Sequence, residues 1–324
     1  MTAAAHTPQS WLAHVPVPLF ASVMGLSGLG LAWRRAGQDL GWPPLIGETI
    51  LALGATAFLA LVLLYVAKLI RHPAMVAAEF AHPVRSSFFA AATIGLMLLS
   101  VGLLPHAPKL GEIVWMVASA AHLAVALAVF RQWFAHNIDI RHSNPAWFIP
   151  VVGNIVAPLG AAVYGYPEIG WFFFSVGVTF WLVLFPIILN RIIFHDQLPA
   201  KFMPTLVILL APPSVSFLSY LGLNDGQIDG FARILFFVAV FTAMLIMVLS
   251  SLFVRAPFAL SWWAYTFPSA AFALASIRYH AAVGGPVSGI AAQVLLIAAT
   301  VVVFLVLART LLALFAGKLF VAEN

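Results

Sequence analysis

The sequence predicts an all-α integral membrane protein, and its composition indicates this class before any single segment is considered. Of the 324 residues, 63% are hydrophobic and only 8% are charged, whereas soluble domains carry about 25% charged residues. The hydrophobic residues extend over the whole chain, so no separate water-soluble half is expected. Residues 1–324 are therefore predicted to form a single transmembrane domain.

Individual membrane spans follow from the length of the apolar runs. A helix needs about 20 apolar residues to cross the hydrocarbon core of a bilayer. By this rule the chain contains ten candidate spans, joined by links that hold turn residues and most of the charges, with short tails at 1–15 and 317–324. The predicted spans are 16–34, 46–69, 85–104, 112–134, 147–164, 169–193, 203–221, 231–254, 257–281 and 287–316.

Ten spans would put both termini on one side of the membrane, and the basic residues indicate which side. Ten of the 15 lysines and arginines fall on the side of the termini and five on the other. Because cytoplasmic loops carry the excess of Lys and Arg, both tails are predicted to be cytoplasmic in an inner (plasma) membrane protein. The basic balance is thus explained by topology, and no nucleic-acid partner is expected. The ten are Lys68, Arg71, Arg85, Arg131, Arg141, Arg191, Lys201, Arg255, Arg309 and Lys318.

The prolines distinguish the odd-numbered spans from the even-numbered ones. Pro158 lies inside the fifth span, Pro212 and Pro213 inside the seventh, and Pro268 inside the ninth, whereas Pro186 is the one interior proline of the even spans. Proline frees a backbone carbonyl, which in a membrane needs another helix, a side chain or water as its partner. The pattern therefore favours five hairpins, with kinked odd helices around a central axis and straight even helices outside. Whether the kinks surround a pore, mark a transporter site or only assist packing is left open by the pattern.

Ionisable groups are scarce inside the spans. No Asp or Glu falls near the middle of any span, although intramembrane carboxylates are typical of proton relays and of acidic cation pores. This disfavours a proton-coupled pump and a cation channel, and it permits the passage of anions. His122 is the one imidazole well inside a span, and without a partner at helical spacing it is interpreted as a packing or subunit-interface residue.

Enzyme chemistry has no anchor in this sequence. There is no cysteine, no HExxH motif, no glycine-rich phosphate loop and no Ser-His-Asp set. No catalytic residue, cofactor or metal site is therefore expected.

Uncharged polar and aromatic residues on the odd spans are candidates for a weakly polar pore wall. The alternative is that the polar ones form hydrogen bonds between helices, and their spacing does not separate the two roles. The candidate pore-lining residues are Phe20, Ser22, Ser87, Phe88, Asn154, Ser214, Ser216 and Thr266.

Five stretches, taken together and in this order, carry a family resemblance. They are "AEFAHPVRSSFFA" at 78–90, "NPAWFIPVVGN" at 144–154, "LLAPPSVSFLSY" at 209–220, "IDGFARILFF" at 228–237 and "WWAYTFP" at 262–268. With them the chain resembles the TehA family, which includes bacterial tellurite-resistance proteins, plant guard-cell slow anion channels, yeast malate permeases and fungal sulfite exporters. One departure is Ala21, where family members often have glycine; its methyl group would narrow that point or change the helix packing.

The resemblance implies ten helices in five hairpins, odd helices inside, and a homotrimer with one pore per subunit. It also implies that Phe267, the phenylalanine of WWxYTFP, is the gate. If an α-helix starts at Pro257, ten residues of about 1.5 Å each put Phe267 about 15 Å deep, near the centre of a core about 30 Å thick. The kink at Pro268 can then turn the ring toward the axis, where it would block and dewet the pore.

The predicted function is passive flow of small anions through an uncharged pore closed by Phe267. The alternative is a secondary transporter or exporter of C4-dicarboxylate, sulfite or tellurite-type oxyanions. A coupled carrier is expected to use a titratable or ion-coordinating group at the midplane, and the sequence shows none there. A membrane enzyme or haem protein is disfavoured by the lack of a histidine pair.

Overall fold

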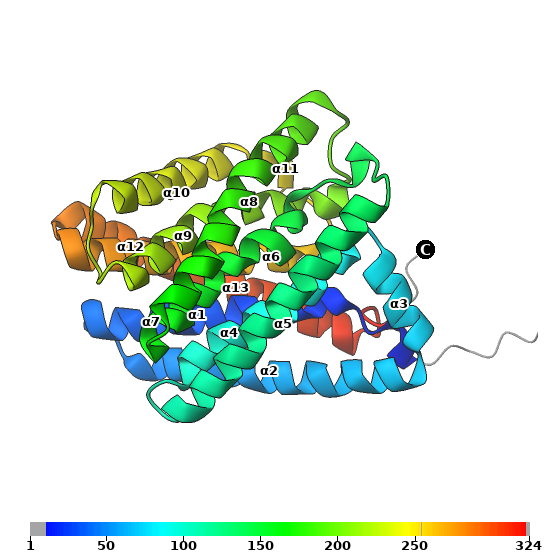
Figure 1. Cartoon of the computed structure of the whole chain (residues 1–324), viewed down its shortest axis with the longest axis horizontal. Helices are drawn as coiled ribbons and strands as arrows, with labels where there is room; N and C mark the ends of the chain where they lie inside the picture. Colours follow the sequence, from blue (N-terminus) through cyan, green and yellow to red (C-terminus); the bar gives the residue numbers. More distant parts are fainter. Residues whose placement is uncertain (1–10, 254, 322–324) are drawn as a thin grey trace, which may run out of the picture.

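The computed structural model describes residues 11–253 and 255–321, which form helices joined by turns and short links. Five of the helices are long and continuous, and they form the outer layer of the bundle (Figure 1). These outer helices are α2 (Pro44–Arg71), α5 (Pro108–Ala135), α8 (Pro167–Phe194), α10 (Gly230–Val248) and α13 (Pro286–Phe315).

The five inner chain segments are compound: each runs as a 3-10 helix and then continues as an α-helix. Runs of 3-10 helix longer than three or four residues are uncommon, yet η7 has 11 residues. The inner segments are η2 (Val17–Leu19) with α1 (Phe20–Asp39), η3 (Arg85–Phe88) with α4 (Phe89–Leu103), η6 (Val152–Val156) with α7 (Ala157–Tyr164), η7 (Ala200–Leu210) with α9 (Ala211–Leu223), and η8 (Leu260–Tyr265) with α12 (Thr266–Val283).

Shorter elements complete the described chain. Helix α3 (Pro73–Ala81) lies in what the sequence predicted to be a link without a span, and η5 (Pro145–Trp147) and α6 (Phe148–Val151) precede η6. The others are η1 (Trp11–His14), η4 (Ile140–His142) and α11 (Ser250–Phe253).

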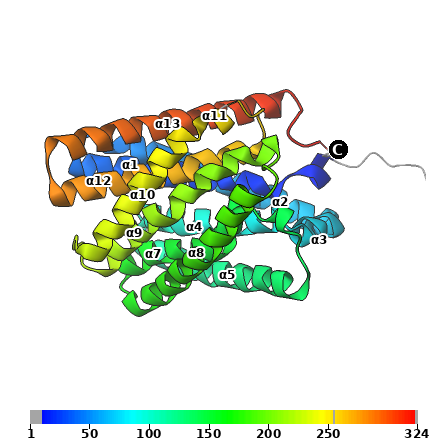
Figure 2. The same cartoon turned by 90° about the horizontal axis from the view of Figure 1, so that it is seen from above.

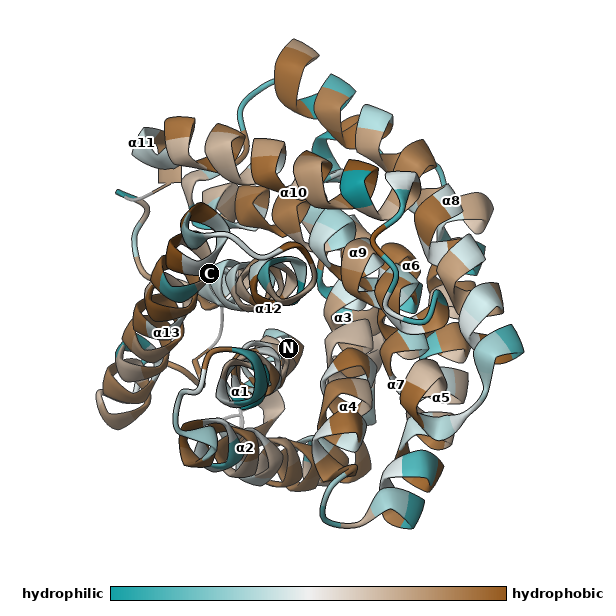
Figure 3. Ribbon diagram, turned by 90° about the vertical axis from the view of Figure 1, so that its left-hand side faces the viewer, coloured by the Kyte–Doolittle hydropathy of each residue, from teal (hydrophilic) through white to brown (hydrophobic). Residues whose placement is uncertain are grey.

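The inner segments close into a ring, which is plain when the bundle is seen end-on (Figure 3). Around the ring, α1 packs on α4, α4 on α7, α7 on α9, α9 on α12, and α12 on α1 again. In an 18-residue stretch of four of these spans, 67% to 83% of the residues are buried, against 17% to 33% in the outer spans. The predicted arrangement of odd helices inside and even helices outside is therefore confirmed.

Glycines allow the two layers to approach closely. A Cβ added at Gly47 of α2 would lie 2.5 Å from the backbone nitrogen of Arg34 in α1. A Cβ at Gly177 of α8 would lie 2.7 Å from the backbone nitrogen of Ile155 in η6. Small residues at such crossings bring helix backbones together in membrane bundles.

The count of spans agrees with the prediction for nine of the ten. Within the described ranges, nine helical stretches are long and apolar enough to cross a membrane. The predicted span 257–281 is not among them; it is helical from Leu260 to Val283, and its helix type changes at Thr266. The expectation of an α-helix starting at Pro257 is wrong, because the helix begins three residues later in 3-10 form. Ten crossings remain a prediction.

The two ends of the described chain lie at the same end of the bundle (Figure 2). The rings of Trp11 and Phe320 stack there with 5.7 Å between their centroids. This placement fits an even number of crossings.

The interior prolines occupy the first turn of an α-helical segment. Pro158 and Pro212 are the second residues of α7 and α9, and Pro268 is the third residue of α12. The first backbone N–H groups of an α-helix have no partner within the helix, so proline is tolerated there. The prolines thus follow the change from 3-10 to α, whereas Pro186 lies inside the continuous helix α8.

Candidate functional site

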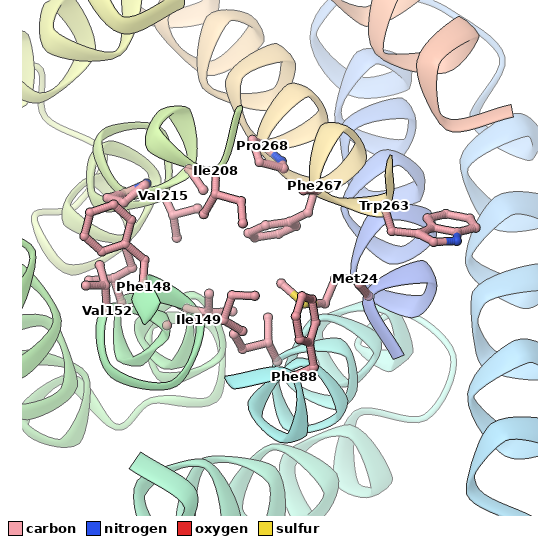
Figure 4. A pocket seen from close by; sticks show the side chains of 18 residues that line it. Met24, Phe88, Phe148, Ile149, Val152, Ile208, Val215, Trp263, Phe267 and Pro268 are labelled. Carbon is pink, nitrogen blue, oxygen red and sulfur yellow. The ribbon is translucent and has the colours of Figure 1, made fainter. Parts of the chain in front are cut away.

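A small cavity lies on the axis of the inner ring, and all five inner segments contribute to its wall (Figure 4). Its volume is about 60 Å³, which would admit a few waters at about 10–15 Å³ each. The described residues that line it are all apolar, and the indole N–H of one of them, Trp263, is bonded to Thr310 Oγ1 at 3.0 Å. An ion in this cavity would lose hydration without gaining polar side-chain partners. We call this space the central cavity; the lining includes Met24, Phe88, Phe148, Ile149, Val152, Ile208, Val215, Phe267 and Pro268.

Phe267 projects into the central cavity from the start of α12 (Figure 4). Only 8% of the residue is exposed. The ring lies against α1 at Gly28, where an added Cβ would be 3.1 Å from Phe267 Cδ2. The missing side chain of Gly28 thus leaves room for the ring, and Pro268 forms the adjoining wall.

A wider hollow of about 360 Å³ lies at the 3-10 end of the ring. Two cationic side chains, Arg85 and Lys201, line it together with the histidines His82 and His142, and among the described lining residues none is acidic. A hollow with one sign of charge and low-dielectric walls raises the local concentration of the opposite charge, here anions. We call it the basic mouth; it is lined by Pro18, His82, Val84, Arg85, Phe88, His142, Lys201, Phe202, Thr205, Ala259, Leu260 and Ser261.

Local contacts hold the basic residues of the mouth in place. His82 Nδ1 accepts hydrogen bonds from the backbone N–H groups of Val84 (3.1 Å) and Arg85 (3.2 Å), which fixes the turn before η3. Lys201 Nζ lies 5.3 Å from the centroid of the Phe202 ring. The Ser261 hydroxyl donates to the Lys201 carbonyl and so ties η8 to η7.

Most of the polar side chains predicted to line a pore donate hydrogen bonds to backbone carbonyls of their own segment. Ser22 donates to the carbonyl of Leu19 at 2.7 Å, and Thr266 donates to that of Trp263 at 2.7 Å. Both bonds lie at a 3-10 to α junction, where carbonyls lose their regular partners. Asn154 donates to Val151 and Ser214 to Leu210, each at 2.7 Å.

The remaining predicted residues divide between buried positions and the cavity. The hydroxyls of Ser87 and Ser216 are buried without a partner among the described residues. The Phe20 ring is turned to α2, where it meets Phe58 and Tyr65 edge-on at 6.2 and 5.8 Å. Of the eight candidates, Phe88 lines the central cavity; the other seven are not part of its wall.

His122 is a buried residue between inner and outer layers. Its Nδ1 lies 2.8 Å from Thr93 Oγ1, and its ring fills the space beside Gly153, where an added Cβ would be 3.0 Å from Cε1. Since it is fully buried within the chain, it packs inside the protein as one of the two interpretations predicted, and the subunit-interface interpretation is wrong.

The sequence did not predict the aliphatic part of the cavity wall, because the candidate pore-lining residues were uncharged polar and aromatic ones. A spacing of three could have identified part of it: Ala21 and Met24 recur at this interval, as do Ile149, Val152 and Ile155. Residues three apart lie on one face of an α-helix, as in α1, and of a 3-10 helix, as in η6. The basic residues of the mouth were used only to assign topology.

The ring of membrane-length helices, the narrow axial cavity and the basic mouth together define the class of helical membrane channels and transporters. A family model described as voltage-dependent anion channel matches residues 14–311. The chain therefore belongs to the voltage-dependent anion channel family, as the resemblance in its motifs indicated. This is a family of channels and transporters rather than of enzymes.

Three relatives show how the chain compares with proteins of this family. It is 30% identical to the S-type anion channel SLAH3 of Arabidopsis thaliana over 313 residues, which are 94% of this chain and 49% of that protein. It is 28% identical to the guard cell S-type anion channel SLAC1 of the same plant, covering 94% of this chain and 57% of the relative. With the tellurite resistance protein TehA homolog of Haemophilus influenzae it shares 26% identity over 82% of this chain and 81% of the relative. The chain thus spans about half the length of the plant relatives.

Proposed function

We propose that the protein is an anion channel that passes small anions passively along the axis of the inner ring. The observation that carries this proposal is the basic mouth, which opens toward an uncharged, apolar central cavity on the same axis. The mouth would concentrate anions, and the cavity offers no fixed carboxylate to repel them. Selectivity would then follow from dehydration cost and pore width. The names of the plant relatives, S-type anion channels, support the same function.

Phe267 is proposed to be the gate of this channel. In support, its ring projects into the central cavity, where the free volume is about 60 Å³, against about 360 Å³ in the mouth. An aromatic ring in an apolar constriction blocks ions by occupying space and by excluding water. The position of Phe267 directly after the change in helix type would let a small backbone adjustment move the ring.

The assembly and orientation are part of the proposal. We infer a homotrimer with one pore per subunit, in a single transmembrane domain with both tails in the cytoplasm. The basic mouth would then open to the cytoplasm, because Arg85 and Lys201 lie on the side that carries most of the lysines and arginines. Lipid would surround the outer helices.

The alternative is a secondary transporter or exporter of C4-dicarboxylate, sulfite or tellurite-type oxyanions. It is favoured by the similarity to a protein named for tellurite resistance. A coupled carrier needs an ion-coordinating group at its substrate site, and among the described residues no charged side chain lines the central cavity.

The test is anion flux through the purified full-length protein. In planar bilayers with unequal chloride concentrations, a channel gives a current that reverses near the chloride equilibrium potential and needs no proton gradient. A carrier gives saturable uptake into proteoliposomes that depends on a pH gradient or on counter-substrate, with no such current. That second result would replace the channel proposal with the transporter alternative.

A further inference from the structure

The basic mouth and the central cavity have one side chain in common. Phe88 lines both, and among the described residues it is the only one that does. On one side of its ring lie the basic residues of the mouth, and on the other lies an apolar wall. Phe88 therefore marks the boundary between a hollow that attracts anions and a cavity that offers them no polar partner.

Three inner segments pass this boundary within a single helical turn. In η7, Thr205 lines the mouth and Ile208 lines the central cavity; in η8, the corresponding pair is Ser261 and Ala264. Pro18 and Ala21 form the same pair at the start of α1. Each pair is three residues apart; in η7 and η8 this is one turn of 3-10 helix and about 6 Å along the axis, whereas Pro18 and Ala21 span the junction between η2 and α1.

The backbone fixes which of two adjacent aromatic rings faces the axis. Phe88 is the last residue of η3 and Phe89 the first of α4. The Phe89 ring is directed outward to Tyr65 and Phe80, with centroid distances of 5.9 and 5.1 Å. The Phe88 ring is only 7% exposed and faces the cavity beside Met24, with Phe267 across from it (Figure 4).

We propose that Phe88 is a second hydrophobic barrier, in series with Phe267, at the entrance from the basic mouth to the central cavity. An anion can keep water and basic partners as far as Phe88, and must shed them there. Its role in conduction rests on the proposed channel function, whereas its role as a barrier can be measured without current. Removing one of two barriers in series leaves the other to limit flow.

The barrier is tested directly by thiol accessibility, because the chain contains no cysteine. Ser261→Cys reports on the mouth and Ile208→Cys on the central cavity; both are made in the full chain and treated with an anionic methanethiosulfonate reagent. We expect Ile208→Cys to react about tenfold more slowly than Ser261→Cys, as a dewetted constriction excludes a hydrated reagent. Adding Phe88→Ala, or Phe88→Leu if the alanine variant does not fold, should speed the reaction at Ile208→Cys and leave Ser261→Cys unchanged.

The matched control is Phe89→Ala, which removes an adjacent ring that faces away from the axis. It should leave the reaction at Ile208→Cys unchanged. If Ile208→Cys reacts as fast as Ser261→Cys with Phe88 present, or if Phe88→Ala does not speed it, then Phe88 is no barrier.

Measurements of anion current distinguish a failure of the Phe88 barrier from a failure of the proposed channel function. With Phe267 present, Phe88→Ala should change the anion current little, whereas Phe88→Ala with Phe267→Ala should exceed Phe267→Ala alone. A double variant that conducts no better than Phe267→Ala overturns the second barrier and leaves the gate in place. If neither conducts, the channel proposal fails, and the accessibility result still decides whether Phe88 bars the cavity.

Discussion

The inner and outer helices of the last hairpin differ in their backbone as well as in their hydropathy. Helix α13 runs for 30 residues as an uninterrupted α-helix on the outside, whereas its partner changes from η8 to α12 at Thr266. A lipid-exposed backbone must satisfy its polar groups within its own helix, so only continuous helices suit the outer layer. Among the described membrane-length segments, the 3-10 stretches lie in the inner ring, where neighbouring side chains can supply partners.

This difference explains where the candidate gate lies. Thr266, at the change in helix type, donates to the carbonyl of Trp263 and so supplies a partner at the junction. Phe267 follows directly. A 3-10 segment has poorer hydrogen-bond geometry than an α-helix, so a change of conformation costs less there than in α13. The inner ring thus combines the aromatic rings with the backbone best able to move them.

The largest loss of stability is expected from breaking a buried ion pair on the outer helix α2. Lys68 of α2 is 1% exposed; its Nζ lies 2.8 Å from Glu79 Oε2 of α3 and 2.7 Å from the Val15 carbonyl. Glu79→Ala leaves this ammonium buried without its counter-ion, which typically costs about 3–5 kcal/mol. Thermal unfolding in detergent should show a large loss of stability. Glu112→Gln, whose partner Lys109 is 80% exposed, is the control and should change little; equal shifts would contradict the account.

The second largest loss of stability is expected where the inner and outer layers are in close contact. A Cβ at Gly177 would lie 2.2 Å from Ile155 Cγ2 and 2.7 Å from the Ile155 nitrogen, so α8 must move away from η6 in Gly177→Ala. Such overpacking costs about 1–3 kcal/mol and should lower the unfolding temperature. Gly230→Ala adds the same methyl group where no atom lies within 4 Å and should have no such cost. An unchanged Gly177→Ala would show that the layers are packed more loosely than described.

A smaller effect, a change in anion current, is expected from a substitution beside Phe267. The methyl group of Gly28→Ala would lie 3.1 Å from Phe267 Cδ2 and push the ring toward the cavity. Anion current through the otherwise unchanged protein should fall by a few-fold, since the passage narrows. With Phe267→Ala the ring is absent, and Gly28→Ala should then have no effect. If Gly28→Ala still reduces the anion current when combined with Phe267→Ala, the substitution acts elsewhere on α1 and not through the Phe267 ring.

The smallest change in anion current is expected on truncating an aromatic residue on the outer surface. Phe241 of α10 is 67% exposed, so Phe241→Ala should leave current within about twofold of the unchanged protein, as is usual away from packed features. Trp115 would be a poor choice for this purpose although it lies on the outer helix α5. It is fully buried, and its indole N–H donates to the Ala157 carbonyl at 2.9 Å. A large change in Phe241→Ala would remove the functional distinction between the two layers.

Hydrophobic runs and prolines were sufficient to predict the two layers. Runs of apolar residues locate membrane helices because the bilayer fixes their length, and Pro158, Pro212 and Pro268 all fall on inner segments. The backbone conformation around these prolines was predicted less well. Their first-turn positions do not by themselves predict a preceding 3-10 segment, and α4 follows η3 with no proline in its first turn.

The site was predictable only in part. Phe267 was identified through the family motif, and Phe88 was one of eight candidates. The hydroxyl of Ser22 looked suited to a pore wall but is held by the carbonyl of Leu19, because a junction carbonyl lies within reach of its own chain. The basic mouth could not be predicted, since Arg85 and Lys201 are far apart in sequence and meet only when the ring closes.

The most direct test of the central claim, that Phe267 closes an anion pathway, is single-channel and macroscopic anion current from Phe267→Ala beside Phe241→Ala. The substitution keeps Pro268 and the junction but removes the ring from the axis. We expect Phe267→Ala to assemble normally and to raise anion current by about tenfold or more as the cavity widens and hydrates, with Phe241→Ala unchanged. A core residue without a gating role would instead cost about 3–5 kcal/mol on truncation, with poor assembly and no gain of current. A well-folded Phe267→Ala that conducts no better than the unchanged protein would contradict the account.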